Sequence, residues 1–166
     1  GKVYLIVGSV RDLILNRKNL DLDIVVEGDA LQLAQAMGKT LKMDLTVHDA
    51  FQTGTLRGPN KVRIDFATAR REMYPKPGAL PVVETAHLDA DIFRRDFTIN
   101  ALAIAINPDT FGKLIDLYGG IADLDKGLVR IFHENSFVDD PTRILRAVRF
   151  EQRFNFEIEP ATRQLL

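Results

Sequence analysis

Cysteine is absent from the 166 residues of this sequence. Its absence excludes disulfide bonds and zinc–thiolate sites, and it fits a reducing compartment. Long apolar runs are also lacking, because none approaches the roughly 18 to 20 residues that span a bilayer. Residues 1–5 lack the charged and apolar regions of a secretory signal peptide. The sequence therefore predicts a cytoplasmic protein that has no segment in a membrane.

Neither sign of charge predominates, since the formal net charge is −1. The distribution of the charges is more informative than their sum. Acidic residues gather early in the chain, at Asp21, Asp23, Glu27 and Asp29. Arginines gather late, at Arg143, Arg146, Arg149, Arg153 and Arg163. An acidic and a basic pole on a nearly neutral chain suit an enzyme that holds metal ions at one place and phosphates at another.

Apolar periodicity and turn residues divide the chain into short elements. Strands are predicted at residues 3–7, 20–26, 45–47, 51–56, 62–67, 102–106 and 128–132. Helices or helical turns are predicted at residues 9–15, 29–37, 96–101 and 121–124, and the pattern is wholly helical from residue 141. Residues 68–90 carry three prolines and little periodicity, which predicts a functional loop. The expected fold is α+β, with a mixed sheet and flanking helices followed by a helical part.

A glycine turn joins the first predicted strand to the first helix, in the segment Val7-Gly8-Ser9-Val10-Arg11-Asp12. A small residue at this turn lets backbone N–H groups approach a phosphate, and the start of a helix favours negative charge. Arg11 lies one turn into the helix, where its guanidinium can clamp the same phosphates. The alternative is an ordinary turn in which Arg11 pairs with Asp12. Gly8 and Arg11 are candidate nucleotide-binding residues.

Asp21 and Asp23 stand two residues apart on a predicted strand. Their side chains then share one face, about 6.5 to 7 Å apart along the backbone. Two carboxylates so placed can share a pair of Mg²⁺ ions, which activate an attacking hydroxyl and steady a triphosphate. The alternative is that both face water, but the apolar residues around them indicate a central strand. Asp21 and Asp23 are the candidate catalytic and metal-binding residues.

Two arginines, Arg94 and Arg95, precede a predicted helix start. Both can reach a phosphate from this position. Asp96 follows them, and its alternative role is local capping of the helix.

Arginines recur every third residue in the helical part, at Arg143, Arg146 and Arg149. This spacing predicts one slowly drifting stripe, with Ile144, Leu145 and Val148 on another face. The alternative is a solvated face, but a stripe of arginine without lysine favours planar, bidentate recognition.

Asp140 and Arg143 stand at the start of this helix, where Pro141 suits the first helical position. A carboxylate accepts from the exocyclic amino group of cytosine or adenine, and a guanidinium donates to the adjacent ring nitrogen. Uracil and guanine present the opposite pattern. Such a pair would accept CTP and ATP and reject UTP and GTP.

Together these motifs resemble the class II tRNA nucleotidyltransferase and bacterial poly(A) polymerase family. The resemblance covers essentially the whole chain and keeps the family's order. Its motifs are GGxVRD at residues 7–12, DxD at 21–23, RRDFTINA at 94–101, DxxGGxxDL at 116–124 and EDPxRxLRxxRF at 139–150. Two positions depart from the pattern. Val7 replaces the first glycine of GGxVRD, and Asp139 replaces the glutamate of the last motif.

The resemblance implies a polymerase-β-like nucleotidyltransferase head at residues 1–134 and the start of an all-helical neck at residues 135–166. We expect the chain to be part of a longer protein, without the body and tail that grip tRNA. The implied nucleotide-binding residues are Gly8, Arg11, Arg95, Asp140, Arg143, Arg146 and Arg149. Asp21 and Asp23 are the implied magnesium ligands, and residues 69–83 look like the family's flexible loop.

The implied reaction is template-independent transfer of CMP or AMP, from CTP or ATP, to the 3′ end of tRNA. Pyrophosphate leaves, and the mechanism uses two Mg²⁺ ions. Two alternatives stay open: a poly(A) polymerase that acts on other RNA ends, and a nucleotide-binding module that has lost catalysis. Asp65 is a candidate for a third carboxylate of the metal site, or a strand residue that faces solvent.

Overall fold

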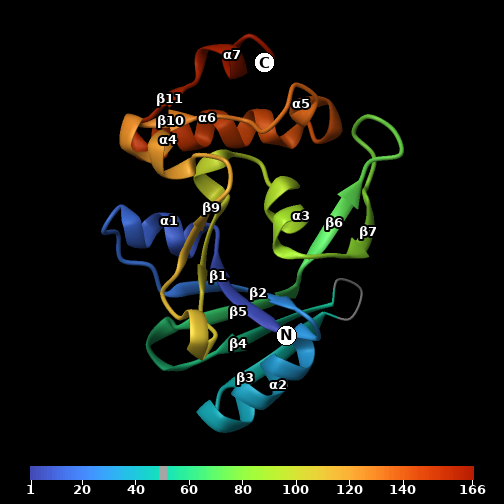
Figure 1. Ribbon diagram of the computed structural model, residues 1–166, viewed down its shortest axis with the longest axis vertical. Coiled ribbons are helices and arrows are strands. Elements are labelled where there is room, and N and C mark those ends of the chain that lie inside the picture. The colour runs from blue at the N-terminus through green and yellow to red at the C-terminus, as the bar shows by residue number, and fades with distance from the viewer. Residues whose placement is uncertain (49–51) are drawn as a thin grey trace.

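The computed structural model describes residues 1–48 and 52–166. Its centre is a seven-stranded sheet in the order β3-β4-β5-β2-β1-β8-β9 (Figure 1). These strands are β1 (Lys2–Ile6), β2 (Asp21–Glu27), β3 (Asp44–His48), β4 (Thr53–Arg57), β5 (Arg63–Thr68), β8 (Leu102–Ala105) and β9 (Leu114–Asp116). Two small sheets pair β6 (Arg70–Met73) with β7 (Val82–Thr85), and β10 (Leu128–Val129) with β11 (Glu157–Ile158).

The large sheet is mixed, as the sequence predicts. β2 runs parallel to β5, and the other neighbouring pairs are antiparallel. β2 lies between β1 and β5, with Ile24, Val25 and Val26 buried at its centre. A strand with neighbours on both edges and consecutive buried residues is covered on both faces. Asp21 and Asp23 therefore lie at the beginning of a central strand, next to its buried residues.

Helices flank the sheet at both of its ends. They are α1 (Gly8–Ile14), α2 (Ala30–Leu41), α3 (Leu88–Phe93), α4 (Gly120–Lys126), α5 (Ser136–Asp139), α6 (Thr142–Phe154) and α7 (Pro160–Arg163). Short 3₁₀ helices occupy Pro59–Lys61, Thr98–Asn100 and Pro108–Thr110. In Figure 1, α4, α5 and α6 lie together at one end, and α2 lies beside β3 at the other. Every helix in the described part of the chain is too short or too polar to span a bilayer.

One core cluster joins α6 to the rest of the molecule. Ala147, Phe150 and Phe154 of α6 pack with Val10 of α1 and with Phe97. The rings of Phe97 and Phe150 meet edge to face, with 5.7 Å between their centroids. Residues on both sides of position 134 thus share apolar contacts, and the division into residues 1–134 and 135–166 stays a prediction.

The buried face of α6 differs from the prediction. It consists of Arg143, Ala147, Phe150 and Phe154, whereas Leu145 is 75% exposed and Val148 is 45% exposed. A buried helical stripe repeats every three or four residues, and the series 143-147-150-154 has this spacing. The two large aromatic rings determine which face turns inward, so Arg143 is separated from the exposed Arg146 and Arg149.

The segment 68–90, for which a functional loop was predicted, contains a β-hairpin that the sequence pattern did not reveal. β6 and β7 pair from Arg70↔Thr85 to Met73↔Val82. The prolines that suggested a loop, at positions 75, 77 and 81, all fall in the connection between these strands. The hairpin tip reaches α5, where the Gly78 N–H donates to the carbonyl oxygen of Val138 over 3.2 Å (Figure 1).

Other differences concern very short elements. Residues 96–101 contain a 3₁₀ helix, and the strand expected at 128–132 ends at Val129. β9 and β11 were not predicted, because two or three residues carry no measurable periodicity. The predicted strand 51–56 is observed from Thr53, and its first position lies outside the described residues.

Candidate active site

The parallel pairing of β2 with β5 places Asp23 directly opposite Asp65. Side chains alternate along a strand, so Asp21 and Asp23 share one face of β2, as the sequence predicts. Asp21 is exposed at the start of the strand, whereas Asp23 is half-buried. Three carboxylates from two neighbouring strands therefore belong to the same region of the sheet.

Asp23 is held by Ser9 of α1. The Ser9 hydroxyl lies 3.4 Å from Oδ2 of Asp23, and the Asp23 N–H donates to Ser9 Oγ over 2.8 Å. Burial raises the pKa of Asp23 above its ordinary value, and repulsion by the Asp65 carboxylate raises it further, while Arg95 and Ser9 oppose the shift. A cation beside Asp23 would relieve this repulsion.

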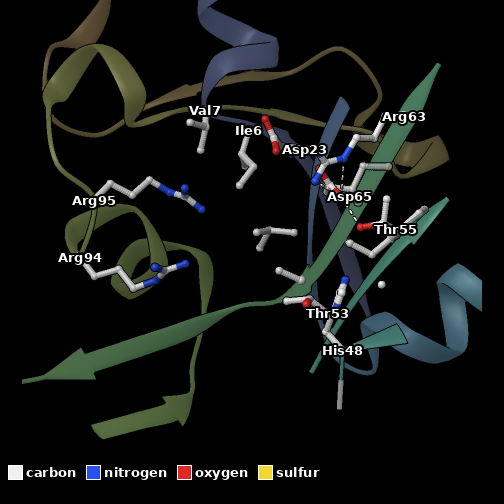
Figure 2. Close-up of a pocket in the computed structure, with 15 residues that line it drawn as sticks. Ile6, Val7, Asp23, His48, Thr53, Thr55, Arg63, Asp65, Arg94 and Arg95 are labelled. Atoms are coloured by element: carbon white, nitrogen blue, oxygen red, sulfur yellow. Dashed lines mark hydrogen bonds and ion pairs between the residues drawn. The ribbon is translucent and has the colours of Figure 1, made fainter. Parts of the chain in front are cut away.

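Asp65 has partners of its own. Thr55 donates to its Oδ1 over 2.5 Å, and Arg63 contributes a 2.9 Å ion pair to its Oδ2. Figure 2 shows Asp65 turned toward Thr55 and Arg63. Both carboxylate oxygens are therefore engaged by neighbouring side chains, which is the arrangement of a strand residue in an ion pair. A metal role for Asp65 is not required by these contacts.

The donor set suits magnesium better than a softer metal. Across residues 1–48 and 52–166, no group of three or more histidine, aspartate or glutamate side chains is arranged to hold a metal ion. Magnesium is usually bound through one or two carboxylates, with water and substrate phosphates completing its shell. Asp21 and Asp23 provide two such carboxylates, so the residues present fit this ion.

A cavity of about 350 Å³ lies beside Asp23 and Asp65. Its opposite wall carries Arg94 and Arg95, whose side chains extend toward the two acids in Figure 2. Residues of β1 to β5, together with Val7, form the remaining lining. Acids on one side and guanidinium groups on the other can hold a metal-bound triphosphate between them.

The two arginines are ordered by a residue that the sequence analysis missed. Asp91 of α3 is 0% exposed, and it pairs with Arg94 over 2.9 Å and with Arg95 over 2.5 Å. Glu72 of β6 pairs with the same Arg94 over 2.9 Å. The available signal was the spacing of Asp91, which lies three and four residues before the arginines on a helix.

Gly8 lies beside Asp23, and its role in nucleotide binding stays a prediction. A Cβ atom added at Gly8 would lie 3.9 Å from Oδ2 of Asp23 and 3.4 Å from Nη2 of Arg11. Arg11 itself is buried, donates to Asp12 and to Asn100, and lies 4.6 Å from the Phe154 ring. The pairing with Asp12, which was the alternative interpretation, is the contact that the structure contains.

Val7 adopts a backbone conformation that glycine favours. Its φ is 55° and its ψ is −126°, close to the first central position of a type II′ turn. A β-branched residue at positive φ is strained by about 1 to 3 kcal/mol. The Val7 side chain also lines the cavity and packs against the core cluster of Tyr4 and Ile6. This explains physically why the glycine of the GGxVRD pattern belongs at this position.

Replacing Val7 by glycine should cost less stability than replacing Val3. Both valines are half-buried and pack on a core cluster, but Val3 lies in an ordinary strand. Both substitutions lose similar burial and add similar backbone entropy to the unfolded chain. The difference between their losses of stability therefore measures the backbone strain at Val7. We expect the free energy of unfolding of Val7→Gly to exceed that of Val3→Gly by about 1 to 3 kcal/mol. Urea denaturation measures both, and equal losses would show that Val7 is unstrained.

Asp140 and Arg143 lie side by side at the start of α6. Oδ1 of Asp140 accepts from the Thr142 N–H over 3.0 Å, and its Oδ2 lies 3.7 Å from Nε of Arg143. Nη2 of Arg143 donates to the backbone oxygen of Arg94 over 2.9 Å. One carboxylate oxygen of Asp140 thus caps the helix, and the other faces the guanidinium.

A second cavity, of about 550 Å³, lies beyond the first one. Arg94 lines both cavities, and Arg143 lines the second together with Tyr74, Phe93 and Asp139. Aromatic, acidic and guanidinium groups around one cavity suit a nucleobase. The remaining predicted arginines lie elsewhere: Arg146 pairs with Asp96, and Arg149 is exposed.

The chain is similar in sequence to known nucleotidyltransferases. The family described as "Poly A polymerase head domain" matches residues 3–130. The A-adding tRNA nucleotidyltransferase of Aquifex aeolicus (strain VF5) is 46% identical over 165 residues, which are 99% of this chain and 20% of that protein. Relatives of lower identity are named CC-adding tRNA nucleotidyltransferase and CCA-adding enzyme. The chain spans between about a fifth and about two-fifths of the length of these relatives.

Solved structures agree with the whole described fold. A CCA-adding enzyme in its apo form II superposes with a TM-score of 0.93 and 55% identity, covering 99% of this chain and 39% of that one. A tRNA nucleotidyltransferase complexed with a primer tRNA and an incoming ATP analog superposes with a TM-score of 0.88 and 41% identity, covering 99% of this chain and 45% of that one. With a family match over residues 3–130 and the same fold throughout, this chain belongs to the poly A polymerase head domain family.

Proposed function

We propose that this chain is the catalytic part of an RNA nucleotidyltransferase that adds CMP or AMP, from CTP or ATP, to the 3′ end of tRNA. The observation that carries the proposal is the cavity between Asp23 on β2 and the pair Arg94 and Arg95, which follows α3. Arg94 connects this cavity to a second one lined by Arg143. The arrangement has room for a triphosphate at one end and a base at the other. The A-adding, CC-adding and CCA-adding names of the relatives support the same reaction class.

In this proposal Asp21 and Asp23 would hold Mg²⁺. When bound, the ions lower the pKa of the attacking 3′ hydroxyl and offset charge on the triphosphate and on the leaving pyrophosphate. Ser9 orients Asp23 through its two hydrogen bonds. The Gly8 turn leaves space beside that carboxylate, and Arg95 binds phosphate oxygens from the opposite wall.

The base end of the nucleotide is assigned to Asp140 and Arg143. Their contact at 3.7 Å provides a carboxylate acceptor next to guanidinium donors, the pattern that cytosine and adenine complement. Arg146 and Arg149 are assigned to support of the nucleotide and of the neck, from the exposed side of α6 rather than from the side of Arg143. Arg11 would act indirectly, because its contacts with Asn100 and Phe154 join the Gly8 turn to α6.

The proposal assigns residues 1–134 to the catalytic head and 135–166 to the start of the neck. We also propose a cytoplasmic location, which the absence of cysteine fits. The chain spans 20% and 45% of two of its relatives, and we assign tRNA binding to the body and tail that the resemblance implies beyond the head and neck.

The test is incorporation of radiolabelled ATP and CTP by the full-length protein in Mg²⁺. The acceptors are tRNA that lacks its CCA end, tRNA that ends in CC, and unstructured oligo(A). We expect addition to one or both tRNAs and little addition to oligo(A). Extension of oligo(A) alone would indicate a poly(A) polymerase. Absence of incorporation on all three acceptors, with nucleotide still bound, would indicate a binding module and reject the proposal.

A further inference from the structure

Asp91 of α3 is a buried carboxylate that accepts hydrogen bonds from three arginines, from the side chains of Arg94 and Arg95 and from the backbone N–H of Arg70. It is 0% exposed, and its partners are Arg94 and Arg95, which line the first cavity, and Arg70 of β6. Oδ1 accepts from Arg94 Nε and Nη2 over 3.1 and 2.9 Å, and from the backbone N–H of Arg70 over 3.1 Å. Oδ2 accepts from Arg95 Nη2 over 2.5 Å. Every contact of this carboxylate is therefore made with a group that leads to the candidate active site or to β6.

Arg95 is the partner of Asp91 that has a buried hydrogen-bond donor still available for a ligand. Asp91 holds one end of its guanidinium, while its buried Nε has no hydrogen-bond partner among the described residues. The same side chain lines the cavity that contains Asp23. A buried donor without a partner is costly, so a ligand that accepts from it gains a hydrogen bond at little reorganisation.

Arg94 is held from two sides. Asp91 takes its Nε and Nη2, and Glu72 of β6 takes its Nη1 over 2.9 Å. Burial would raise the pKa of Asp91, but Arg95 and Arg94 outweigh burial and hold it below its ordinary value. The carboxylate thus stays ionised, and its charge permits two guanidinium groups to lie side by side next to a cavity.

We propose that Asp91 is a positioning residue that aims Arg95 and Arg94 at the phosphates of the incoming nucleotide. The inference rests on the proposed nucleotidyl transfer and adds a residue to it. Arginine has many rotamers, and preorganised donors stabilise charge that develops in a transition state more than donors that must first be ordered. Asp91 does not touch the nucleotide and acts through the two arginines.

The experiment is a double-mutant cycle on the full-length protein, with AMP addition to tRNA ending in CC as the readout, or CMP addition if that is the wild-type activity. We expect Asp91→Asn to lower kcat/KM at least tenfold. The loss should fall mainly on kcat, because removal of the carboxylate leaves the cluster more positive and nucleotide binding is not weakened by charge. In an Arg95→Ala background, Asp91→Asn should lower kcat/KM by a clearly smaller factor than it does in the wild type, since one of its two routes of action is already gone and only Arg94 remains.

The matched control is Asp89→Asn on the same helix, whose carboxylate is exposed, and it should keep wild-type kcat/KM. If Asp91 has a purely structural role, Asp91→Asn and Arg95→Ala should lower kcat/KM by independent factors that multiply, and this result would overturn the inference. Wild-type kcat/KM in Asp91→Asn would overturn it as well. If Asp91→Asn does not fold, Asp91→Glu keeps the charge and displaces the carboxylate. Its kcat/KM should then fall at least fivefold, and the fall should be smaller in the Arg95→Ala background, where only Arg94 remains to be positioned. Failure of the wild-type protein on every acceptor would instead reject the proposed function.

Discussion

Asp23→Ala is expected to abolish nucleotide addition while the protein remains folded. Asp23 faces the cavity from β2, and removal of a metal-binding carboxylate loses several kcal/mol of charge stabilisation, so kcat should fall by about a thousandfold or more. Asp21→Ala should have a comparable effect, because both carboxylates are assigned to the same ions. Single-turnover incorporation in Mg²⁺ measures the loss, and thermal unfolding verifies the fold.

Asp44→Ala is the matched control for these variants. Asp44 is an exposed aspartate on β3 of the same sheet, and its removal should leave kcat unchanged. Near-normal turnover of either Asp21→Ala or Asp23→Ala would contradict the metal assignment. Relief of the repulsion between Asp23 and Asp65 also opposes any large loss of stability in Asp23→Ala, so inactivity through unfolding is not expected.

Asp140→Asn should relax base selection without removing the helix cap. Asn caps helices as well as Asp does, so one side-chain oxygen can still accept from the Thr142 N–H. The other oxygen, which faces Arg143, becomes an amino group that donates to the uracil carbonyl instead of repelling it. The preference for CTP over UTP should narrow by about five- to a hundredfold, since an unpaired buried polar group costs about 1 to 3 kcal/mol.

Asp140→Ala separates the two roles of this side chain. It should show the same loss of selectivity together with about 1 kcal/mol of lost stability, because the cap is removed as well. Arg143→Ala should weaken CTP and ATP together. Incorporation efficiencies for all four nucleotides on the full-length protein provide the measurement. If both Asp140 variants slow every nucleotide by one factor, Asp140 is only a helix cap and base recognition lies elsewhere.

The sequence alone determined the class of fold and the main motifs. Apolar periodicity and turn residues predicted the mixed sheet, and the DxD spacing placed Asp21 and Asp23 on one face of a central strand, which the structure confirms. The resemblance of five ordered motifs predicted the family, which the comparisons confirm. These features depend on residues close in the chain, where spacing translates directly into geometry.

Only the tertiary structure decided which distant residues meet. The pairing of β2 with β5 brings Asp65 opposite Asp23, and the hairpin brings Glu72 to Arg94. Neither contact has a local signature, because register and hairpin placement are set by how the whole core packs. Asp91 is the clearest case: its spacing from the arginines is visible in the sequence, but its complete burial beside two cavities is a property of the packed molecule. Likewise, the rings of Phe150 and Phe154 turned Arg143 inward, against the stripe that its spacing suggested.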